Sequence, residues 1–96
     1  MPDLLDDATI EQKLTGLPDW EYAGGALRKT WQLKGFLSTM TFANAIAHLA
    51  HRANHHPDLE NHYNRVRVAL HTWNENAVTD KDIALAREIE SVAETT

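Results

Sequence analysis

One stretch of alternating apolar and polar residues limits what this chain can fold into more than any other feature. Residues 65–73 read RVRVALHTW. Because successive side chains of a β-strand point to opposite faces, this alternation predicts a strand with one buried face and one solvated face. One predicted face carries Val66, Val68, Leu70 and Thr72, and the other carries Arg65, Arg67, Ala69, His71 and Trp73. We expect this strand to pair with another that begins near Leu59.

A pair of glycines predicts a β-hairpin earlier in the chain. Gly24 and Gly25 separate two short stretches within residues 20–33, which read WEYAGGALRKTWQL. Glycine readily adopts the positive φ values that tight hairpin turns require. The second stretch alternates as a strand does, with Trp31 on its expected inner face.

Three helices are predicted from capping residues and from apolar residues spaced three or four positions apart. The first is expected over residues 9–15, where Thr9 and Gln12 form a capping-box pair. The last begins at Thr79, which Asp82 follows by three residues, as in the first turn of a capped helix. Both helices carry an apolar stripe of the kind that packs against a sheet.

The middle helix is expected to run from Ser38, as its N-cap, to about His55. Its apolar stripe comprises Phe42, Ile46, Leu49, Ala50 and Ala53. The helix should end there because Pro57 disfavours the helical conformation of the residue before it, which moves His56 off the helix. On this helix His51 and His55 lie four residues apart and share one face.

The order helix, hairpin, helix, two strands, helix lacks the alternation of strands and helices that would indicate a parallel sheet. A chain of 96 residues is long enough for one domain. We therefore predict one α+β domain over residues 1–96, with a four-stranded antiparallel sheet and about three helices packed on one face.

Composition narrows the classes of function. The chain has no cysteine, so the sequence excludes a disulfide, a thiolate nucleophile and a cysteine-bound metal. Its formal net charge of −5 argues against direct nucleic-acid binding, which usually requires clustered Lys and Arg. No apolar run approaches the roughly 18 residues of a membrane span, and the N-terminal MPDLLDDATI has no secretory-signal pattern. We expect a cytoplasmic protein with no membrane association.

Histidines are concentrated in one segment, and three interpretations of them are open. Residues 51–63, HRANHHPDLENHY, hold four of the six histidines. The first interpretation is an ordinary surface role, which we favour for His48 and His62. The second is a metal site at His51 and His55, whose i, i+4 spacing lets two helical ligands reach one ion, although no Glu follows His51 as in an HExxH motif.

The third interpretation is acid–base catalysis by two neighbouring imidazole rings. Imidazole changes charge close to neutral pH, so one ring can donate a proton while its neighbour accepts another. Such a pair suits a dehydration, in which a leaving hydroxyl group is protonated and a second proton is removed elsewhere on the same molecule. We expect His55 and His56 to face one flat substrate together.

The histidine segment and the positions after it resemble the signature of the pterin-4a-carbinolamine dehydratases. The resemblance is specific over residues 51–82, and the flanking sequence is similar over residues 9–93. The matching positions are His51, His55, His56, Pro57, Tyr63, Trp73 and Asp82.

The resemblance implies a hydro-lyase on the α+β fold. Members of the family dehydrate 4a-hydroxytetrahydropterin, which aromatic amino acid hydroxylases leave, to quinonoid dihydropterin and so support tetrahydrobiopterin recycling. The resemblance further implies a homodimer or homotetramer that uses neither a metal nor a bound organic cofactor. Some animal members also bind a homeodomain transcription factor, so the alternative is a non-catalytic binding or dimerisation module, or a transcriptional cofactor, on the same fold.

The resemblance also implies which residues form the site. His55 and His56 would carry the proton transfers, and His51 is the third catalytic candidate. The substrate-binding residues would be Asn54, His55, His56, Pro57, His71, Thr72, Trp73 and Asn74. Asp82 and Tyr63 belong to the signature, and we expect structural roles for both, Asp82 at a helix N-terminus and Tyr63 packed on a strand.

Position 73 generates a prediction about the reaction rate. Better-known animal members of the family place a third catalytic histidine where this chain has Trp73, and indole does not exchange protons at neutral pH. A missing acid or base costs about 3 to 5 kcal/mol of barrier, which ring stacking worth about 1 kcal/mol does not offset. Trp73→His should therefore raise the turnover of 4a-hydroxytetrahydropterin, and an unchanged or lower turnover would count against this view of position 73.

Overall fold

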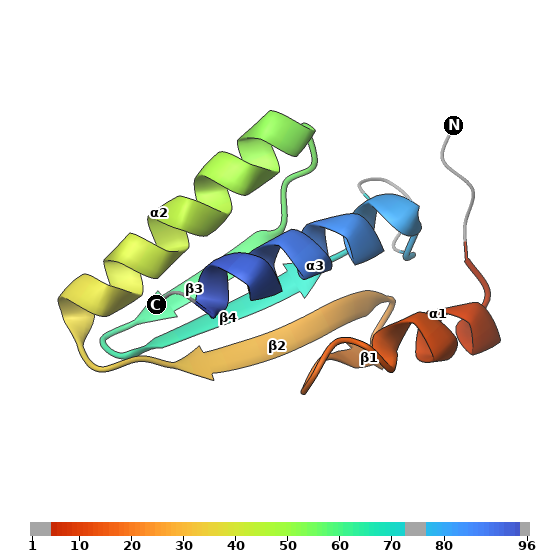
Figure 1. Ribbon diagram of the computed structural model, residues 1–96, viewed down its shortest axis with the longest axis horizontal. Helices are drawn as coiled ribbons and strands as arrows, with labels where there is room; N and C mark the ends of the chain where they lie inside the picture. The colour runs from red at the N-terminus through yellow and green to blue at the C-terminus, as the bar shows by residue number, and fades with distance from the viewer. Residues whose placement is uncertain (1–4, 73–76, 95–96) are drawn as a thin grey trace.

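A computed structural model of the protein describes residues 5–72 and 77–94 (Figure 1). Its helices are α1 (Asp7–Leu14), α2 (Phe36–Ala53) and α3 (Asp80–Ala93), and its strands are β1 (Glu21–Ala23), β2 (Ala26–Gln32), β3 (Asp58–His62) and β4 (Arg65–Leu70). The predicted α+β class, with three helices and a four-stranded antiparallel sheet, is confirmed for these residues. None of the described helices is long and apolar enough to cross a membrane.

The sheet has the strand order β1-β2-β4-β3, and every neighbouring pair is antiparallel. β1 and β2 form the predicted hairpin, with Gly24 and Gly25 at φ of 61° and 76° in its turn. β4 lies in the interior of the sheet and pairs with β3, which begins at Asp58, close to the predicted start. α2 and α3 lie across one face of the sheet, and α1 lies beside β1 (Figure 1).

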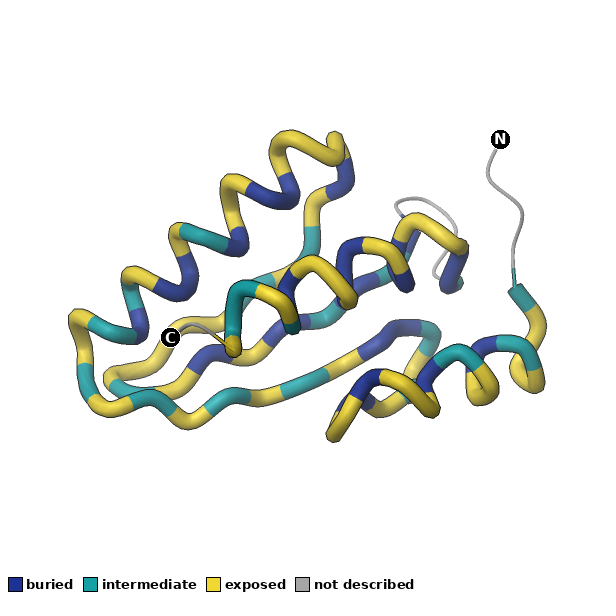
Figure 2. Tube along the Cα trace, viewed as in Figure 1, coloured by how far each residue is buried: buried dark blue, intermediate teal, exposed yellow. Residues whose placement is uncertain are grey.

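The core lies between the sheet and the two helices that cover it. Val66, Val68 and Leu70 are at most 2% exposed, as the alternation of β4 predicted. Figure 2 shows that buried positions recur along α2 and α3 at helical spacing. The helices contribute Phe42, Ile46, Leu49, Ile83, Leu85, Ala86 and Ile89 to this core.

α1 begins at Asp7, earlier than predicted, and a different residue caps it. Asp6 is the N-cap, and its Oδ1 atom accepts a hydrogen bond of 2.8 Å from the amide of Thr9. Hydrogen bonds from the side chain and the amide of Thr9 lower the pKa of the Asp6 carboxyl below its ordinary value. The predicted capping pair of Thr9 and Gln12 is wrong, because Asp6 supplies a carboxylate acceptor one turn earlier.

α2 begins at Phe36, so the predicted N-cap at Ser38 is wrong. Gly35 is the N-cap and has no side chain with which to accept a hydrogen bond. Its carbonyl oxygen instead accepts from the amide of Thr39 at 3.0 Å and from the hydroxyl of Thr39 at 2.8 Å. The side chain of Thr39, one turn into the helix, therefore helps to hold the first turn in place of an N-cap side chain.

α2 ends in a left-handed turn at Asn54, which has φ of 54°. The amide of His55 donates to the carbonyl of Ala50 at 3.0 Å. The amide of Asn54 donates to the carbonyl of His51 at 3.1 Å. These two bonds form a Schellman motif, which closes the helix and redirects the chain. His55 therefore lies outside the helix, and the prediction that it shares a helical face with His51 is wrong, as is the burial predicted for Ala53.

A largely buried ion pair joins the inner face of β2 to α3. Nζ of Lys29 contacts the carboxylate of Glu90, and the two side chains are only 9% and 15% exposed. The same ammonium group donates to the carbonyl of Pro18 at 2.8 Å and lies 4.9 Å from the ring centroid of Trp31. Trp20 donates its indole N–H to Glu90 at 2.8 Å. Each charge therefore has an opposite charge and further polar contacts, as buried ions require.

This ion pair predicts the outcome of two substitutions. Glu90→Ala should lower the free energy of unfolding by about 3 kcal/mol, because it leaves the Lys29 ammonium group buried without a counter-charge. Glu60→Ala is the matched control, since Glu60 forms an exposed ion pair with Arg67 at 3.7 Å. Its removal should cost less than about 1 kcal/mol. Urea denaturation measures both free energies, and equal losses would refute the difference we draw between the two pairs.

The turn at Asn54 provides a second test of the fold. Asn and Gly tolerate the left-handed conformation, whereas a β-branched residue is strained in it. Asn54→Gly should change the free energy of unfolding by less than about 0.5 kcal/mol, and Asn54→Val should lower it by about 1 to 2 kcal/mol. Urea titrations measure both changes. If the two variants were equally stable, the turn would not impose the left-handed conformation.

Candidate functional site

The carboxylate of Asp82 is the centre of a buried polar cluster. Asp82 is fully buried at the N-terminus of α3, and its Oδ1 atom lies 2.5 Å from Nε2 of His55. His55 is only 7% exposed, although the residues on either side of it are exposed. Two positions of the predicted signature that are far apart in the sequence therefore meet inside the protein.

The second carboxylate oxygen of Asp82, Oδ2, accepts two further hydrogen bonds. The donors are the amide of Thr79 at 2.9 Å and the hydroxyl of Thr72 at 3.0 Å. The hydroxyl oxygen of Thr79 in turn accepts from the amide of Lys81 at 3.3 Å, and the predicted capping box is confirmed. Asp82 does more than cap α3, because the same carboxylate also contacts His55 and Thr72.

His56 lies in a different environment from His55. It is exposed, and its ring centroid lies 6.1 Å from that of His51, with 55° between the ring planes. Both rings border a hollow of about 450 Å³ between α2 and the start of β3. The lining consists of Asn44, Ala47, His48, Ala50, His51, His56, Pro57 and Leu59.

The structure reverses the predicted pairing of these histidines. We expected His51 to share a face with His55, but the ring beside His51 is that of His56. The side chain of His55 is turned inward to Asp82 instead. The left-handed turn at Asn54 is the physical reason, because it redirects the chain directly after the helix. His55 does not border the hollow that His56 lines, so the prediction that both rings face one shared cavity is wrong.

His71 was predicted to bind substrate, and it lies directly after β4. Its Nε2 atom lies 3.1 Å from Oδ2 of Asp58, the first residue of β3. Its Nδ1 atom is buried and has no hydrogen-bond partner among the described residues. The ring therefore presents one nitrogen to a carboxylate, while no described residue hydrogen-bonds to the other.

The remaining predicted substrate-binding residues do not lie together. Pro57 borders the histidine-lined hollow. Thr72 is buried in the Asp82 cluster, and Asn54 is exposed at the end of α2. Trp73 and Asn74 lie outside the described residues.

Tyr63 is not the packed strand residue that we predicted. It lies in the turn between β3 and β4 and is 71% exposed. Its ring stacks on that of Phe36, with centroids 6.4 Å apart and 28° between the planes. The prediction fails because β3 ends at His62, so the alternation of a strand no longer governs the next residue.

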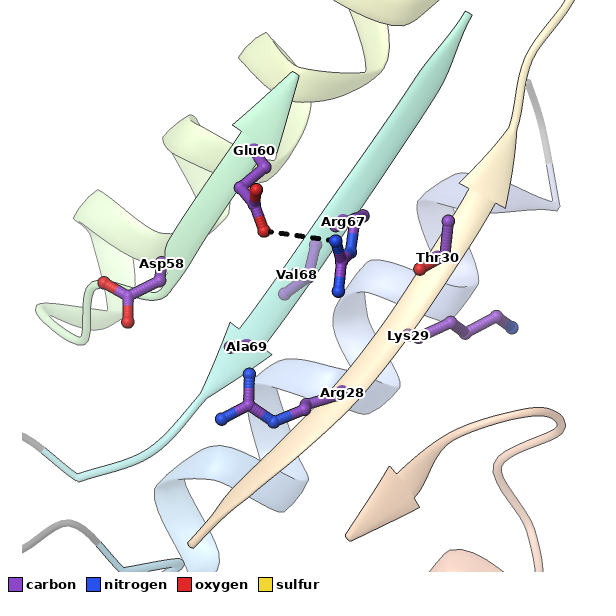
Figure 3. Close-up of a pocket in the computed structure, with 8 residues that line it drawn as sticks. All are labelled: Arg28, Lys29, Thr30, Asp58, Glu60, Arg67, Val68 and Ala69. Atoms are coloured by element: carbon purple, nitrogen blue, oxygen red, sulfur yellow. Dashed lines mark ion pairs between the residues drawn. The ribbon is translucent and has the colours of Figure 1, made fainter. Parts of the chain in front are cut away.

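A second hollow, of about 190 Å³, lies over β2, β3 and β4 (Figure 3). It is lined by Arg28, Lys29, Thr30, Asp58, Glu60, Arg67, Val68 and Ala69. Arg67 and Glu60 form an ion pair of 3.7 Å there, so part of its charge is neutralised. Among the described residues, no histidine and no predicted site residue borders it. Proton transfer at neutral pH is therefore better served by the histidine-lined hollow.

The structure removes the geometric basis for the metal-site interpretation of His51 and His55. That interpretation required both rings on one helical face, and His55 lies outside the helix. Within residues 5–72 and 77–94, no three His, Asp or Glu side chains are grouped as a metal ion would require.

Thr79 and Leu59 are among the residues of the site that were not identified as such from the sequence. Thr79 was predicted only as a cap, yet its hydroxyl oxygen lies 2.8 Å from that of Thr72. Leu59 was predicted only as a strand residue, yet it borders the histidine-lined hollow. Neither role leaves a pattern in the sequence, because a contact across the fold has no fixed spacing along the chain.

Comparisons with known proteins identify the family. Residues 3–92 match the family described as pterin 4 alpha carbinolamine dehydratase. A protein of Thermomicrobium roseum, provisionally named a pterin-4-alpha-carbinolamine dehydratase, is 46% identical over 93% of this chain and 96% of its own length. A crystal structure described as a transcriptional coactivator/pterin dehydratase from Brucella melitensis is 32% identical, with a TM-score of 0.89 over 95% of this chain and 99% of that chain.

A pterin dehydratase-like protein described as a RuBisCO assembly factor in the alpha-carboxysome is a more distant neighbour. It has a TM-score of 0.63 at 19% identity, over 77% of this chain and 86% of that chain, so the likeness concerns the fold alone. The family match and the Thermomicrobium relative, by contrast, extend over nearly the whole chain. This chain belongs to the pterin 4 alpha carbinolamine dehydratase family.

Proposed function

We propose that this protein is a hydro-lyase that dehydrates 4a-hydroxytetrahydropterin to quinonoid dihydropterin. The observation that carries the proposal is the contact between Asp82 and His55. The next residue in the sequence, His56, is exposed and borders a hollow. A carboxylate-held imidazole and a second, accessible imidazole are the groups that a two-proton reaction needs. Family membership and the names of the relatives support the same reaction.

The reaction is a balanced exchange of protons. The hydroxyl group on C4a takes up one proton, the C4a–O bond breaks, and water leaves. N5 loses its proton, and the electron pair of the N5–H bond forms the N5=C4a double bond. The enzyme therefore gives one proton and receives one, and the step needs no oxidant or reductant.

We assign the base that removes the N5 proton to His55, which is 7% exposed and lies outside the hollow that His56 lines. This role requires the bound pterin to extend from the hollow to the Nδ1 atom of His55. Its Nε2 atom faces the Asp82 carboxylate, so a proton taken from the substrate arrives at Nδ1. The imidazolium that forms is then stabilised by a charge-assisted hydrogen bond to the same carboxylate.

His56 is suited to the acid that protonates the leaving hydroxyl group. It is exposed, so it can regain a proton from solvent after each turnover. His51, whose ring centroid lies 6.1 Å away, borders the same hollow and remains the third catalytic candidate. Its imidazole can donate to or accept from the neighbouring ring.

The proposed activity is tested with freshly generated 4a-hydroxytetrahydropterin, whose decay is followed by ultraviolet absorbance. The wild-type protein should accelerate the decay, and His56→Ala should lower the catalysed rate by about 10²- to 10⁴-fold. His62→Ala is the matched control, because His62 is an exposed histidine outside the hollow. It should retain the wild-type rate.

A wild-type rate equal to that of buffer alone would overturn the proposal. That result would favour the alternative of a non-catalytic binding or dimerisation module on the same fold. A wild-type rate that His56→Ala leaves unchanged would retain the activity but remove His56 from the mechanism.

The proposal includes a homodimer or homotetramer. Phe36, Leu37 and Tyr63 are 55%, 78% and 71% exposed, and the rings of Phe36 and Tyr63 stack on each other. Large apolar side chains gathered on a surface favour association with another protein surface. β1 and β3 are the edge strands of the described sheet, which offers a second surface for association.

The substrate of this reaction also indicates what precedes it. A pterin that carries a hydroxyl group at C4a arises when a tetrahydropterin-dependent oxygenase has used molecular oxygen. We therefore propose a functional link to an aromatic amino acid hydroxylase, as the resemblance implies.

A further inference from the structure

Two buried threonines lie behind the contact between Asp82 and His55. The hydroxyl oxygen of Thr72 lies 3.0 Å from Oδ2 of Asp82 and 2.8 Å from the hydroxyl oxygen of Thr79. Thr72 is 7% exposed, and both Thr79 and Asp82 are fully buried. The backbone of Thr72 is held as well, because its amide donates to the carbonyl of Ala77 at 2.8 Å.

The number of protons gives this chain of hydrogen bonds one direction. A hydroxyl group has a single proton, and an ionised carboxylate can only accept. The proton of Thr72 is therefore directed to Asp82, and the proton of Thr79 is directed to Thr72. The oxygen of Thr79 is then left to accept from the amide of Lys81, which lies 3.3 Å away.

This direction has a consequence for His55. Oδ2 of Asp82 receives two donors, from the hydroxyl of Thr72 and the amide of Thr79, and Oδ1 faces Nε2 of His55. A carboxylate with these donors acts as the acceptor toward the ring, so Nε2 carries a proton. Nδ1 is then the nitrogen that has a free electron pair in the neutral ring.

We propose that Thr72 is a positioning residue, whose hydroxyl group, oriented by Thr79, keeps Asp82 an acceptor and fixes the Nε2-protonated form of His55. The role of Thr72 in turnover rests on the proposed dehydratase function. Which nitrogen of the His55 ring carries the proton does not depend on that function. Thr72 therefore does not donate to the substrate, which the resemblance had implied it would contact, because its only hydroxyl proton is already directed to Asp82.

Loss of the Thr72 hydroxyl should release this constraint. Asp82 would keep its buried position but lose one of the two donors to Oδ2, and a buried acceptor without its donor is costly. Protonation of the carboxylate relieves that cost: His55 passes its Nε2 proton to Asp82 and takes up one proton from solvent at Nδ1, so the pair as a whole gains one proton. The ring then carries its proton on Nδ1 and can no longer accept one there from a substrate.

The proposal is tested by nitrogen NMR of protein labelled with ¹⁵N-histidine, in mildly alkaline buffer and without substrate. In the wild type, Nε2 of His55 should have the shift of a protonated ring nitrogen and Nδ1 that of an unprotonated one. Thr72→Val, which keeps the volume, and Thr72→Ala, which relieves any crowding, should both move the two shifts toward each other. Thr72→Ser restores the hydroxyl group and should restore the wild-type shifts.

Thr39→Val is the matched control for the loss of a buried hydroxyl group. Thr39 is fully buried, and its hydroxyl lies 2.8 Å from the carbonyl oxygen of Gly35 and 3.1 Å from that of Tyr63. Neither of these acceptors belongs to the Asp82 cluster. This variant should therefore lose stability but keep the wild-type shifts of His55.

Turnover provides the second readout. Thr72→Val should lower kcat for 4a-hydroxytetrahydropterin by about tenfold, as expected for one lost hydrogen bond, and leave KM unchanged. Thr72→Ser should restore kcat.

Three outcomes decide the question. Wild-type shifts of His55 in both Thr72→Val and Thr72→Ala would overturn the proposal, and so would an equal change of these shifts in Thr39→Val. Altered shifts in a protein that shows no dehydratase activity at all would sustain the positioning role and overturn the proposed function instead.

Discussion

The buried carboxylate of Asp82 is the interaction on which the site depends. Its hydrogen-bond donors come from three segments that are separate in the sequence: His55 after α2, Thr72 after β4 and Thr79 before α3. A fully buried carboxylate that lost one of these donors would retain its charge without the partner that stabilises it. The carboxylate therefore links the end of α2, the end of β4 and the start of α3 through hydrogen bonds. The position of His55 depends on how these three elements pack together.

Two histidines that are adjacent in the sequence acquire different chemistry from one turn of the backbone. The left-handed conformation of Asn54 turns His55 into the core, where it is 7% exposed and its partner is a carboxylate. His56 follows on the surface beside His51. A buried ring keeps one hydrogen-bond partner and one orientation, whereas an exposed ring can exchange protons with solvent. The proposed dehydration, which gives one proton and takes another, would use both properties, and the two rings come from consecutive residues.

The fold was predictable from the sequence where the signal is local, and the site was predictable only in part. The alternation around Val66 and Val68 is a property of the strand itself, so it correctly predicted β4 and its buried face. The first two helix caps were misplaced, because Asp6 and Gly35 compete with nearby residues that look equally suitable. The histidine pairing was wrong because a left-handed turn at Asn54 cannot be distinguished from a further helical residue by spacing alone. The contact between Asp82 and His55 depends on how α3 packs, which no local pattern encodes.

Two carboxylates of α3, the fully buried Asp82 and the largely buried Glu90, differ in how their negative charge is balanced. Glu90 faces the permanent positive charge of Lys29, so its pairing does not depend on any proton transfer. Among the described residues, the ion-pair partner of Asp82 is His55, whose ring is positive only when it holds a second proton. The helix N-terminus and two neutral threonines stabilise the carboxylate while the ring is neutral. The pair is balanced in charge only when His55 holds a second proton, which is the form that the proposed role of His55 as a base would produce.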